Sequence, residues 1–198
     1  MSLKVFTRCS LLSTHCYNCR MIQPKPYRLS VEEYEHLAQM WHEDERVELL
    51  DGEIYAMAPI SDDHVGALLI LQRRLEMFRE RAILSVQNPL RLTESEPQPD
   101  LVLLELPLER YTKRLPQAED VLLLVEVSKS TLEYDRTKKL PVYARATIPE
   151  VWIRNLIDNQ LEVYRNPQGE RYTSLSTYTE GQEVAPLAFS GKPVQWWV

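Results

Sequence analysis

Residues 121–127, with the sequence VLLLVEV, decide the fold. The segment is apolar at odd and even positions alike, except at Glu126. A strand of this kind is typical of the centre of a sheet that helices cover on both faces. Because burying an unpaired carboxylate costs several kcal/mol, Glu126 requires a cation, a proton or a hydrogen-bonding partner inside the protein.

Further strands and helices are expected N-terminal to this strand. Pro99-Asp100 leads into a predicted strand over 101–105, and an acidic, proline-rich connection separates it from another predicted strand over 83–92. Ser61 can cap a helix whose apolar positions, spaced by three or four residues, are His64, Leu68, Leu71, Leu75 and Phe78. In this pattern His64 is interpreted as a packing or capping residue.

The region before residue 61 is predicted to hold a hairpin and a short helix. Asp51-Gly52 lies between two apolar-bearing runs in residues 46–57, which indicates a β-hairpin and places Glu48 on a strand or its lead-in. Ser30 and Glu33 form a capping box ahead of a short helix.

A helix and several strands are expected after residue 128. The helix begins with Ser130 and Glu133 as a capping box or with Asp135 as a later N-cap, and Pro141 should kink it or limit its regular part. Residues 150–157 and 161–165 read as a hairpin, followed by a strand over 171–178. The predicted fold class is α/β, with a mixed central sheet flanked by helices and added β-hairpins.

Composition limits the class of protein. A chain of 198 residues, 44% hydrophobic and 26% charged, suits one compact domain. No apolar run approaches the roughly 20 residues of a membrane-spanning helix, and three cysteines do not make a disulfide framework, so a reducing cytoplasm is expected. The net charge of -6 requires that any phosphate-binding face be local.

Residues 1–26 are expected to be a disordered or non-native extension. Residues 1–28 hold five basic residues and no acidic one, and the first twenty hold all three cysteines. An alternative interpretation is a zinc-binding segment built from Cys9, His15, Cys16 and Cys19, since thiolate and imidazole ligands suit tetrahedral zinc. The expected domain is then residues 27–198.

Carboxylates at the predicted strands point to a metal site. Magnesium prefers oxygen ligands and keeps several waters, so Asp100, Glu126 and a strand carbonyl such as that of Val127 would suffice to hold it. The alternative is a structural ion pair between these acids and an arginine.

An ordered set of motifs resembles one known family. The motifs are QNPLRL at 87–92, PD at 99–100, EVS at 126–128, STLEYDR at 130–136, KLPVYA at 139–144 and IPEVWI at 148–153. Together they resemble the Uma-type restriction endonucleases of the PD-(D/E)xK nuclease superfamily, over residues 27–197. The resemblance implies a restriction-endonuclease-like fold, DNA as the substrate and Mg²⁺ as the cofactor, for which Mn²⁺ can substitute.

The resemblance also assigns roles to particular residues. Asp100 and Glu126 match the superfamily's metal-binding carboxylates, and Glu48 resembles the early acidic residue that often completes the site. Ser128 stands where the superfamily has lysine, and Lys129 points to the other face of its strand. The match to the KLPVYA motif selects Lys139 as the relocated lysine, with Lys138 as the neighbour that could be mistaken for it. Supporting roles near this centre are expected for Gln87, Ser128 and Tyr143.

The function expected from this resemblance is metal-dependent hydrolysis of DNA phosphodiester bonds. Asp100, Glu126, Glu48 and Lys139 are the expected catalytic residues, and a homodimer is expected because cutting two strands favours two sites. The alternative is a catalytically inactive nuclease-fold protein that serves in binding or assembly. Trp196 and Trp197 are expected to make core or dimer contacts.

Overall fold

The computed structural model describes residues 25–41 and 46–197 as an α/β fold with two sheets. The smaller sheet is the hairpin of β1 (Val47–Leu50) and β2 (Glu53–Ala56). The larger sheet has six strands in the order of the chain: β3 (Ile83–Val86), β4 (Leu101–Leu104), β5 (Val121–Ser128), β6 (Glu150–Asn155), β7 (Gln160–Gln168) and β8 (Arg171–Tyr178). All neighbouring pairs are antiparallel except β5 and β6, which makes the sheet mixed.

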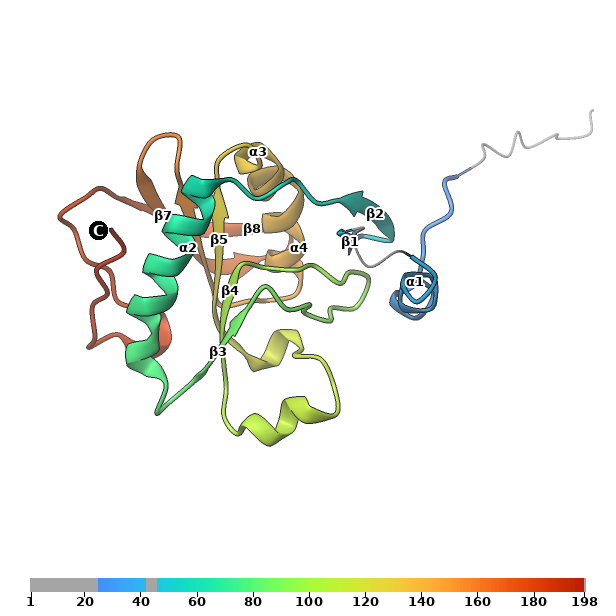
Figure 1. Cartoon of the computed structure of the whole chain (residues 1–198), viewed down its shortest axis with the longest axis horizontal. Coiled ribbons are helices and arrows are strands. Elements are labelled where there is room, and N and C mark those ends of the chain that lie inside the picture. Colours follow the sequence, from blue (N-terminus) through green and yellow to red (C-terminus); the bar gives the residue numbers. More distant parts are fainter. Residues whose placement is uncertain (1–24, 42–45, 198) are drawn as a thin grey trace, which may run out of the picture.

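Helices cover the large sheet on both sides (Figure 1). The α-helices are α1 (Val31–Ala38), α2 (Asp62–Leu75), α3 (Leu132–Tyr134) and α4 (Leu140–Arg145). A π-helical turn, η4 (Asp135–Lys139), joins α3 to α4. Short 3-10 helices lie at Glu76–Phe78, Leu108–Thr112, Ala118–Asp120 and Leu187–Phe189. In the described residues, no helix is long and apolar enough to cross a membrane.

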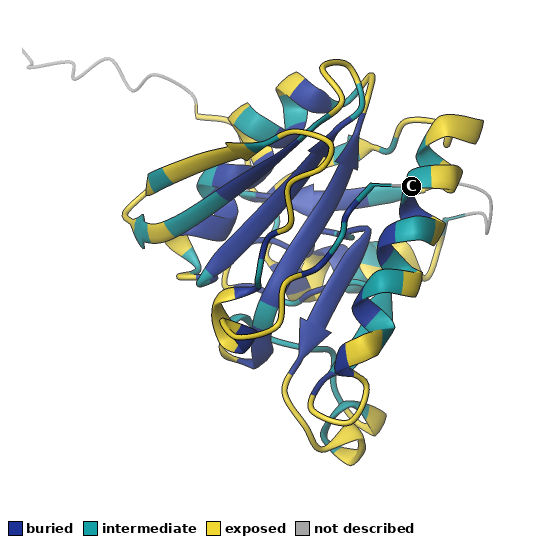
Figure 2. Cartoon of the chain, turned by 90° about the vertical axis from the view of Figure 1, so that its left-hand side faces the viewer, coloured by how far each residue is buried: buried dark blue, intermediate teal, exposed yellow. Residues whose placement is uncertain are grey.

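The two faces of β5 belong to two different cores. Leu123, Val125 and Val127 pack in the core that includes α2 and the C-terminal segment. Leu124 packs in the opposite core, which contains residues of α3 and α4. Figure 2 shows the strands at the centre of the sheet as buried, in contrast to the largely exposed β8 at its edge. Glu126 and Ser128 share the face of Leu124, because side chains alternate along a strand, and therefore face the α3–α4 side.

Several predicted elements are confirmed. β5 is central in the sheet, and Asp51-Gly52 forms the turn between β1 and β2. Ser30 and Glu33 form the capping box of α1, and the Ser61 side chain caps α2. The predicted helix after residue 128 and the strands β6, β7 and β8 are also present.

Two details of the predicted elements were wrong. The strand predicted over 83–92 ends at Val86, because Gln87 has a φ of 49° and turns the backbone out of the strand. Neither Ser130 nor Asp135 caps the following helix: its N-cap is Thr131, and Asp135 is inside the helical segment with its side chain bonded to Ser128.

Pro141 limits the regular part of the helix, one of the two effects predicted for it. Pro141 lies in the first turn of α4 and the helical segment widens just before it, where the Leu140 N–H donates to the Asp135 carbonyl five residues back. Proline has no N–H to donate, so a regular helix would lack one backbone hydrogen bond at this position. The wider π-helical turn changes the backbone pairing there.

Candidate active site

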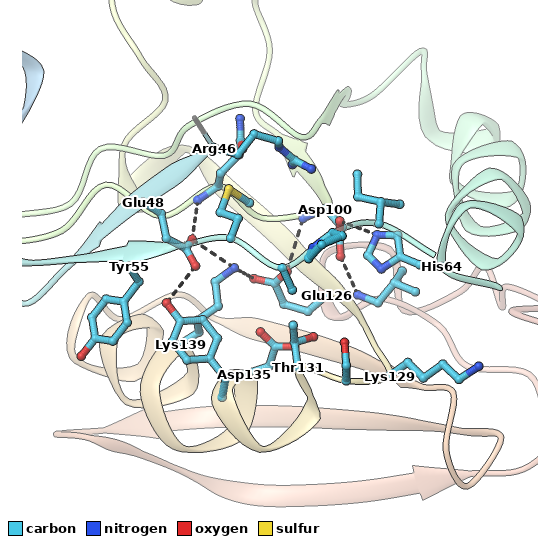
Figure 3. A pocket seen from close by; sticks show the side chains of 18 of the residues that line it. Arg46, Glu48, Tyr55, His64, Asp100, Glu126, Lys129, Thr131, Asp135 and Lys139 are labelled. Carbon is cyan, nitrogen blue, oxygen red and sulfur yellow. Dashed lines mark hydrogen bonds and ion pairs between the residues drawn. The ribbon is translucent and has the colours of Figure 1, made fainter. Parts of the chain in front are cut away.

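A pocket of about 300 Å³ lies between the large sheet, the hairpin and η4 (Figure 3). Residues 55–61, which connect β2 to α2, line one part of it, and residues 129–131 line another. Polar side chains from separate elements converge in the pocket: Glu48, His64, Gln87, Asp100, Glu126, Asp135 and Lys139. The fold therefore brings together acidic and basic groups that are far apart in the sequence.

Asp100 immediately precedes β4 and leans across to β5. Its Oδ2 accepts a hydrogen bond of 2.8 Å from the Val127 backbone N–H, and its own N–H lies 3.4 Å from Glu126 Oε2. The Asp100 residue is only 8% exposed. The pairing of β4 with β5 thus places Asp100 beside Glu126, as the sequence motifs predicted for a shared site.

Lys139 lies between Glu126 and Glu48. Its Nζ is 2.9 Å from Glu126 Oε1 and 3.3 Å from Glu48 Oε2. Tyr143, one turn further along, donates a hydrogen bond of 2.6 Å to Glu126 Oε1. The lysine selected by the family motif therefore contacts the predicted carboxylates, whereas the neighbouring Lys138 is exposed and lies 5.9 Å from the centre of the Tyr55 ring.

Glu48 enters the site from the small sheet. It is buried on β1, where its carboxylate accepts hydrogen bonds from the Gln98 backbone N–H at 3.0 Å and the Tyr134 hydroxyl at 3.0 Å. Glu48 is therefore not a surface strand residue. Glu48 is instead a buried acid that links the hairpin to η4 through Lys139.

Ser128 shares the face of Glu126, but it does not contact Lys139 directly. Its hydroxyl donates a hydrogen bond of 2.7 Å to Asp135 Oδ2, and both residues are buried. Lys129, on the opposite face, pairs with the exposed Asp63. The Ser128 hydroxyl therefore anchors η4 to β5.

Gln87 holds the other side of Asp100. Its Nε2 donates to Asp100 Oδ1 at 3.1 Å, while its backbone carbonyl accepts a hydrogen bond of 2.8 Å from Gln98 Nε2. Its positive φ is unfavourable for a residue other than glycine, and these contacts fix it in that conformation.

His64 and Asp135 were not identified as site residues from the sequence. His64 Nε2 is 3.0 Å from Asp100 Oδ1, so the ring lines the pocket and does not merely pack against apolar neighbours. In a sequence, a histidine in the first turn of a helix is weak evidence for a functional residue. The helix dipole disfavours the protonated form of the ring there, unless an acidic side chain faces it. For Asp135, the capping pattern at residues 130–135 favoured a role as the N-cap of the helix.

The comparisons with known proteins identify the family of the chain. A model of the Uma2 family, described as "Putative restriction endonuclease", matches residues 31–192. The chain belongs to this family. None of the curated proteins compared with the chain matches it.

A solved structure shows the same fold at low sequence identity. It is the crystal structure of a putative nuclease belonging to DUF820 from Anabaena variabilis ATCC 29413, with a TM-score of 0.65 and 12% sequence identity. The match covers 85% of this chain and 95% of the other. This Uma2 family member therefore shares its mixed α/β fold with that putative nuclease, and the predicted fold class is confirmed.

The electrostatics of the Uma2 site show an excess of buried acid. Burial raises the pKa of Glu126 to about 8 in spite of Lys139, and burial also raises the pKa of Asp135. The pKa of Lys139 is well above its ordinary value, because the surrounding carboxylates outweigh the effect of burial. The Asp100 hydrogen bond raises the pKa of His64, while the donors around Asp100 lower the pKa of that acid although burial opposes them.

The donor set of the Uma2 site fits a hard divalent cation. Four buried carboxyl groups, Glu48, Asp100, Glu126 and Asp135, surround the single buried lysine of the described residues, so a further positive charge would relieve their repulsion. Across residues 25–41 and 46–197, no three His, Cys, Asp or Glu side chains are arranged to hold a metal ion together. Magnesium needs only one or two carboxylates when waters and carbonyls complete its octahedron.

Two other predicted features lie away from this site. Trp196 is buried in the core on the α2 side, where its indole N–H donates to the Gln182 carbonyl at 2.9 Å, and Trp197 is partly buried beside it. Residues 1–24 lie outside the described part of the chain. They include all but the last two residues of the predicted N-terminal extension, and also the alternative zinc ligands Cys9, His15, Cys16 and Cys19.

Proposed function

We propose that this protein is a divalent-metal-dependent nuclease that hydrolyses phosphodiester bonds in DNA. The observation that carries the proposal is the convergence of Glu48, Asp100, Glu126 and Lys139 from β1, the start of β4, β5 and η4 in one pocket. Membership of the Uma2 family supports this function. Lys139 alone, without nearby acids, would be compatible with many other roles.

Asp100, Glu126 and the Val127 carbonyl are the proposed ligands of Mg²⁺ or Mn²⁺, and Glu48 is a further candidate ligand. When bound there, the cation would lower the pKa of a water molecule and neutralise charge on the scissile phosphate. Asp100 and Glu126 would contribute carboxylate oxygens from adjacent strands, whose pairing fixes their separation. Tyr143 would hold Glu126 in place through its hydroxyl and has no proposed contact with the substrate.

Lys139 is proposed to orient the attacking water and to stabilise negative charge that develops on the phosphate. Its cationic Nζ is positioned by two carboxylates, and its side chain is only 5% exposed, so it can act with little reorganisation. Ser128 contributes indirectly, because its bond to Asp135 fixes the turn that carries Lys139. The proposed lysine therefore lies on η4, where it contacts Glu126 and Glu48.

A homodimer is the proposed assembly, because two sites related by a twofold axis could cut both strands of a duplex. Arg46 and Lys129 line the pocket in addition to Lys139, and Lys129 pairs with the exposed Asp63. Arg46 and Lys139 would supply the local phosphate-binding charge that the overall net charge of -6 does not.

The test is cleavage of supercoiled and single-stranded DNA with Mg²⁺, Mn²⁺ or EDTA. We compare the wild type with Asp100→Asn and Lys139→Met, and Lys138→Met serves as the matched control because its lysine is adjacent but exposed. We expect metal-dependent cleavage that falls by at least about a hundredfold in the first two variants, because each loses a charged group at the reacting centre. The Lys138→Met variant should retain wild-type activity.

Two outcomes would contradict the proposal. Equal cleavage by the wild type and the Asp100→Asn variant would identify a contaminating nuclease. A folded wild type that neither cleaves DNA nor binds Mn²⁺ in a calorimetric titration would instead support the alternative, an inactive nuclease-fold protein whose acids are structural. The occupation of the usual lysine position by Ser128 is the observation that favours this alternative.

A further inference from the structure

Asp100 has few free acceptor positions. An ionised carboxylate accepts about four hydrogen bonds, two on each oxygen. His64 Nε2 at 3.0 Å and Gln87 Nε2 at 3.1 Å both approach Oδ1, and the Val127 N–H at 2.8 Å approaches Oδ2. Donors from the described residues therefore fill both positions on Oδ1 and one on Oδ2, which leaves one position, on Oδ2, for any further ligand.

His64 is held firmly enough to maintain this arrangement. It lies in the first turn of α2, where its backbone N–H bonds to the capping Ser61, and its side chain is only 17% exposed. Leu68, one turn further along α2, anchors the helix in the core. Because a carboxylate ion only accepts hydrogen bonds, the Nε2 of His64 must be the donor of this contact.

We propose that His64 is a positioning residue that restricts Asp100 to binding a cation through Oδ2 alone, and that it thereby makes the site selective for Mg²⁺ over Ca²⁺. This inference rests on the proposed function, since it concerns the cation of that same site. Both oxygens of Asp100 could bind one cation only if the hydrogen bond of His64 or of Gln87 to Oδ1 were given up. Asp100 therefore offers a single oxygen, Oδ2, to a cation.

The selectivity follows from the different coordination of the two cations. Mg²⁺ requires a near-ideal octahedron and binds through single oxygens of one or two carboxylates. Ca²⁺ takes six to eight oxygens and commonly uses both oxygens of a carboxylate. An Asp100 that offers only Oδ2 therefore suits the smaller cation and withholds a ligand atom from the larger one.

The experiment measures calorimetric affinities for Mg²⁺ and for Ca²⁺ separately, without DNA, on the full chain. The His64→Phe variant keeps a ring but loses the donor, and His64→Ala is a second donor-free variant should the first not fold. His64→Gln restores an N–H donor. Leu68→Ala is the matched control, because it loosens the packing of α2 without removing any contact to Asp100. Circular dichroism checks that each variant is folded.

We expect the ratio of Mg²⁺ to Ca²⁺ affinity to fall about tenfold in the donor-free variants, the lower end of the effect usual for hydrogen-bonding partners of metal ligands. His64→Gln should restore the ratio, and Leu68→Ala should leave it unchanged. A wild-type ratio in both donor-free variants, or an equal loss of both affinities, would overturn the selectivity role and leave the nuclease proposal intact. A wild type that binds neither cation would overturn both proposals.

Discussion

Asp120 and Glu126 are both buried acids, yet their pKa values are shifted in opposite directions. Burial raises the pKa of each. Asp120 also accepts hydrogen bonds from Arg114, from Arg110 and from the Gln117 backbone N–H, which together lower its pKa to about 2. Glu126 has one lysine and other acids nearby, and its pKa is about 8. The number of cations around each acid thus separates a structural carboxylate from one suited to bind a further cation.

This difference predicts how Asp120 contributes to stability. We expect Asp120→Asn to lower the free energy of unfolding by about 2 kcal/mol at pH 7, since its pKa lies about two units below that in an unfolded chain. A lowered pKa stabilises the fold above pH 4, and the contribution disappears as the pH falls toward 2. Urea unfolding at several pH values measures it.

Glu119→Gln is the control for this measurement, because Glu119 is adjacent to Asp120 but exposed. It should change stability by less than about 0.5 kcal/mol at every pH. A difference between the wild type and Asp120→Asn that persisted unchanged at pH 2 would contradict the assignment, since Asp120 is then about half protonated in the folded state and most of its contribution is lost.

At the scale of elements, η4 depends on its contact with β7 to present Lys139. Arg136 on η4 makes two hydrogen bonds to Glu162 on β7, one of them 3.1 Å from Nε to Oε2. Glu162 also accepts hydrogen bonds from the Tyr164 hydroxyl at 2.6 Å and from Asn155 Nδ2 at 2.9 Å. This buried acid therefore ties the lysine-bearing turn to two strands of the sheet.

Removing Arg136 should consequently destabilise the protein. We expect Arg136→Ala to cost about 2–3 kcal/mol, less than the loss of a fully buried pair because the arginine side chain is 36% exposed. Arg73→Ala is the matched control: Arg73 pairs with Glu76 on the surface and should cost less than about 1 kcal/mol. Chemical denaturation compares them, and equal costs would show that the Glu162 contact does not anchor η4.

At the scale of the molecule, the hairpin turn connects the N-terminal segment to the rest of the fold. The carbonyl of Gly52 accepts a hydrogen bond of 3.0 Å from the Leu29 N–H, and its own N–H donates to the Glu94 carbonyl at 3.0 Å. A Cβ atom on Gly52 would lie 2.6 Å from the Arg28 Cβ, which is too close for any side chain. Glycine at this position therefore permits three separate segments to meet.

This close approach predicts different costs for two similar glycine substitutions. Gly52 and Gly169 both have positive φ, but a Cβ on Gly169 would meet no atom within 4 Å. We expect Gly169→Ala to cost about 1 kcal/mol through backbone conformation alone. Gly52→Ala should cost at least about 1 kcal/mol more and should also speed proteolysis of residues 25–38. Thermal unfolding measures both variants, and equal losses would mean that the N-terminal segment does not bind tightly to the turn.

The sequence predicted the parts of this structure that depend on local patterns. The apolar run of β5, the Asp51-Gly52 turn and the capping box at Ser30 each identified an element correctly. The end of β3 was missed because it depends on contacts of Gln87 with Gln98 and Asp100. These two partners are 11 and 13 residues away along the chain, beyond the reach of a local sequence pattern.

The candidate site could be predicted only in part. Asp100 and Glu126 were suggested by acids at apolar strands, and Lys139 came from the family motif, since nothing in its helical pattern distinguishes it from Lys138. His64 was missed because its importance arises from Asp100, a partner on a different element that no spacing rule connects to it. Catalytic roles for these residues remain predictions for the experiments above.

The distances along the chain between contacting site residues bear on the order in which the site assembles. Tyr143 and Glu126 are 17 residues apart and Asp100 and Val127 are 27 apart, whereas Tyr134 and Glu48 are separated by 86. Closing a longer loop costs more entropy, so we expect the first two contacts to form before the third during folding. Glu48 also sits on a hairpin with a small core of its own, of which Val31, Tyr34 and Leu49 are the buried members. During folding, Asp100, Glu126 and Lys139 would therefore come together first, and the site would be completed only when the hairpin that carries Glu48 closes over them.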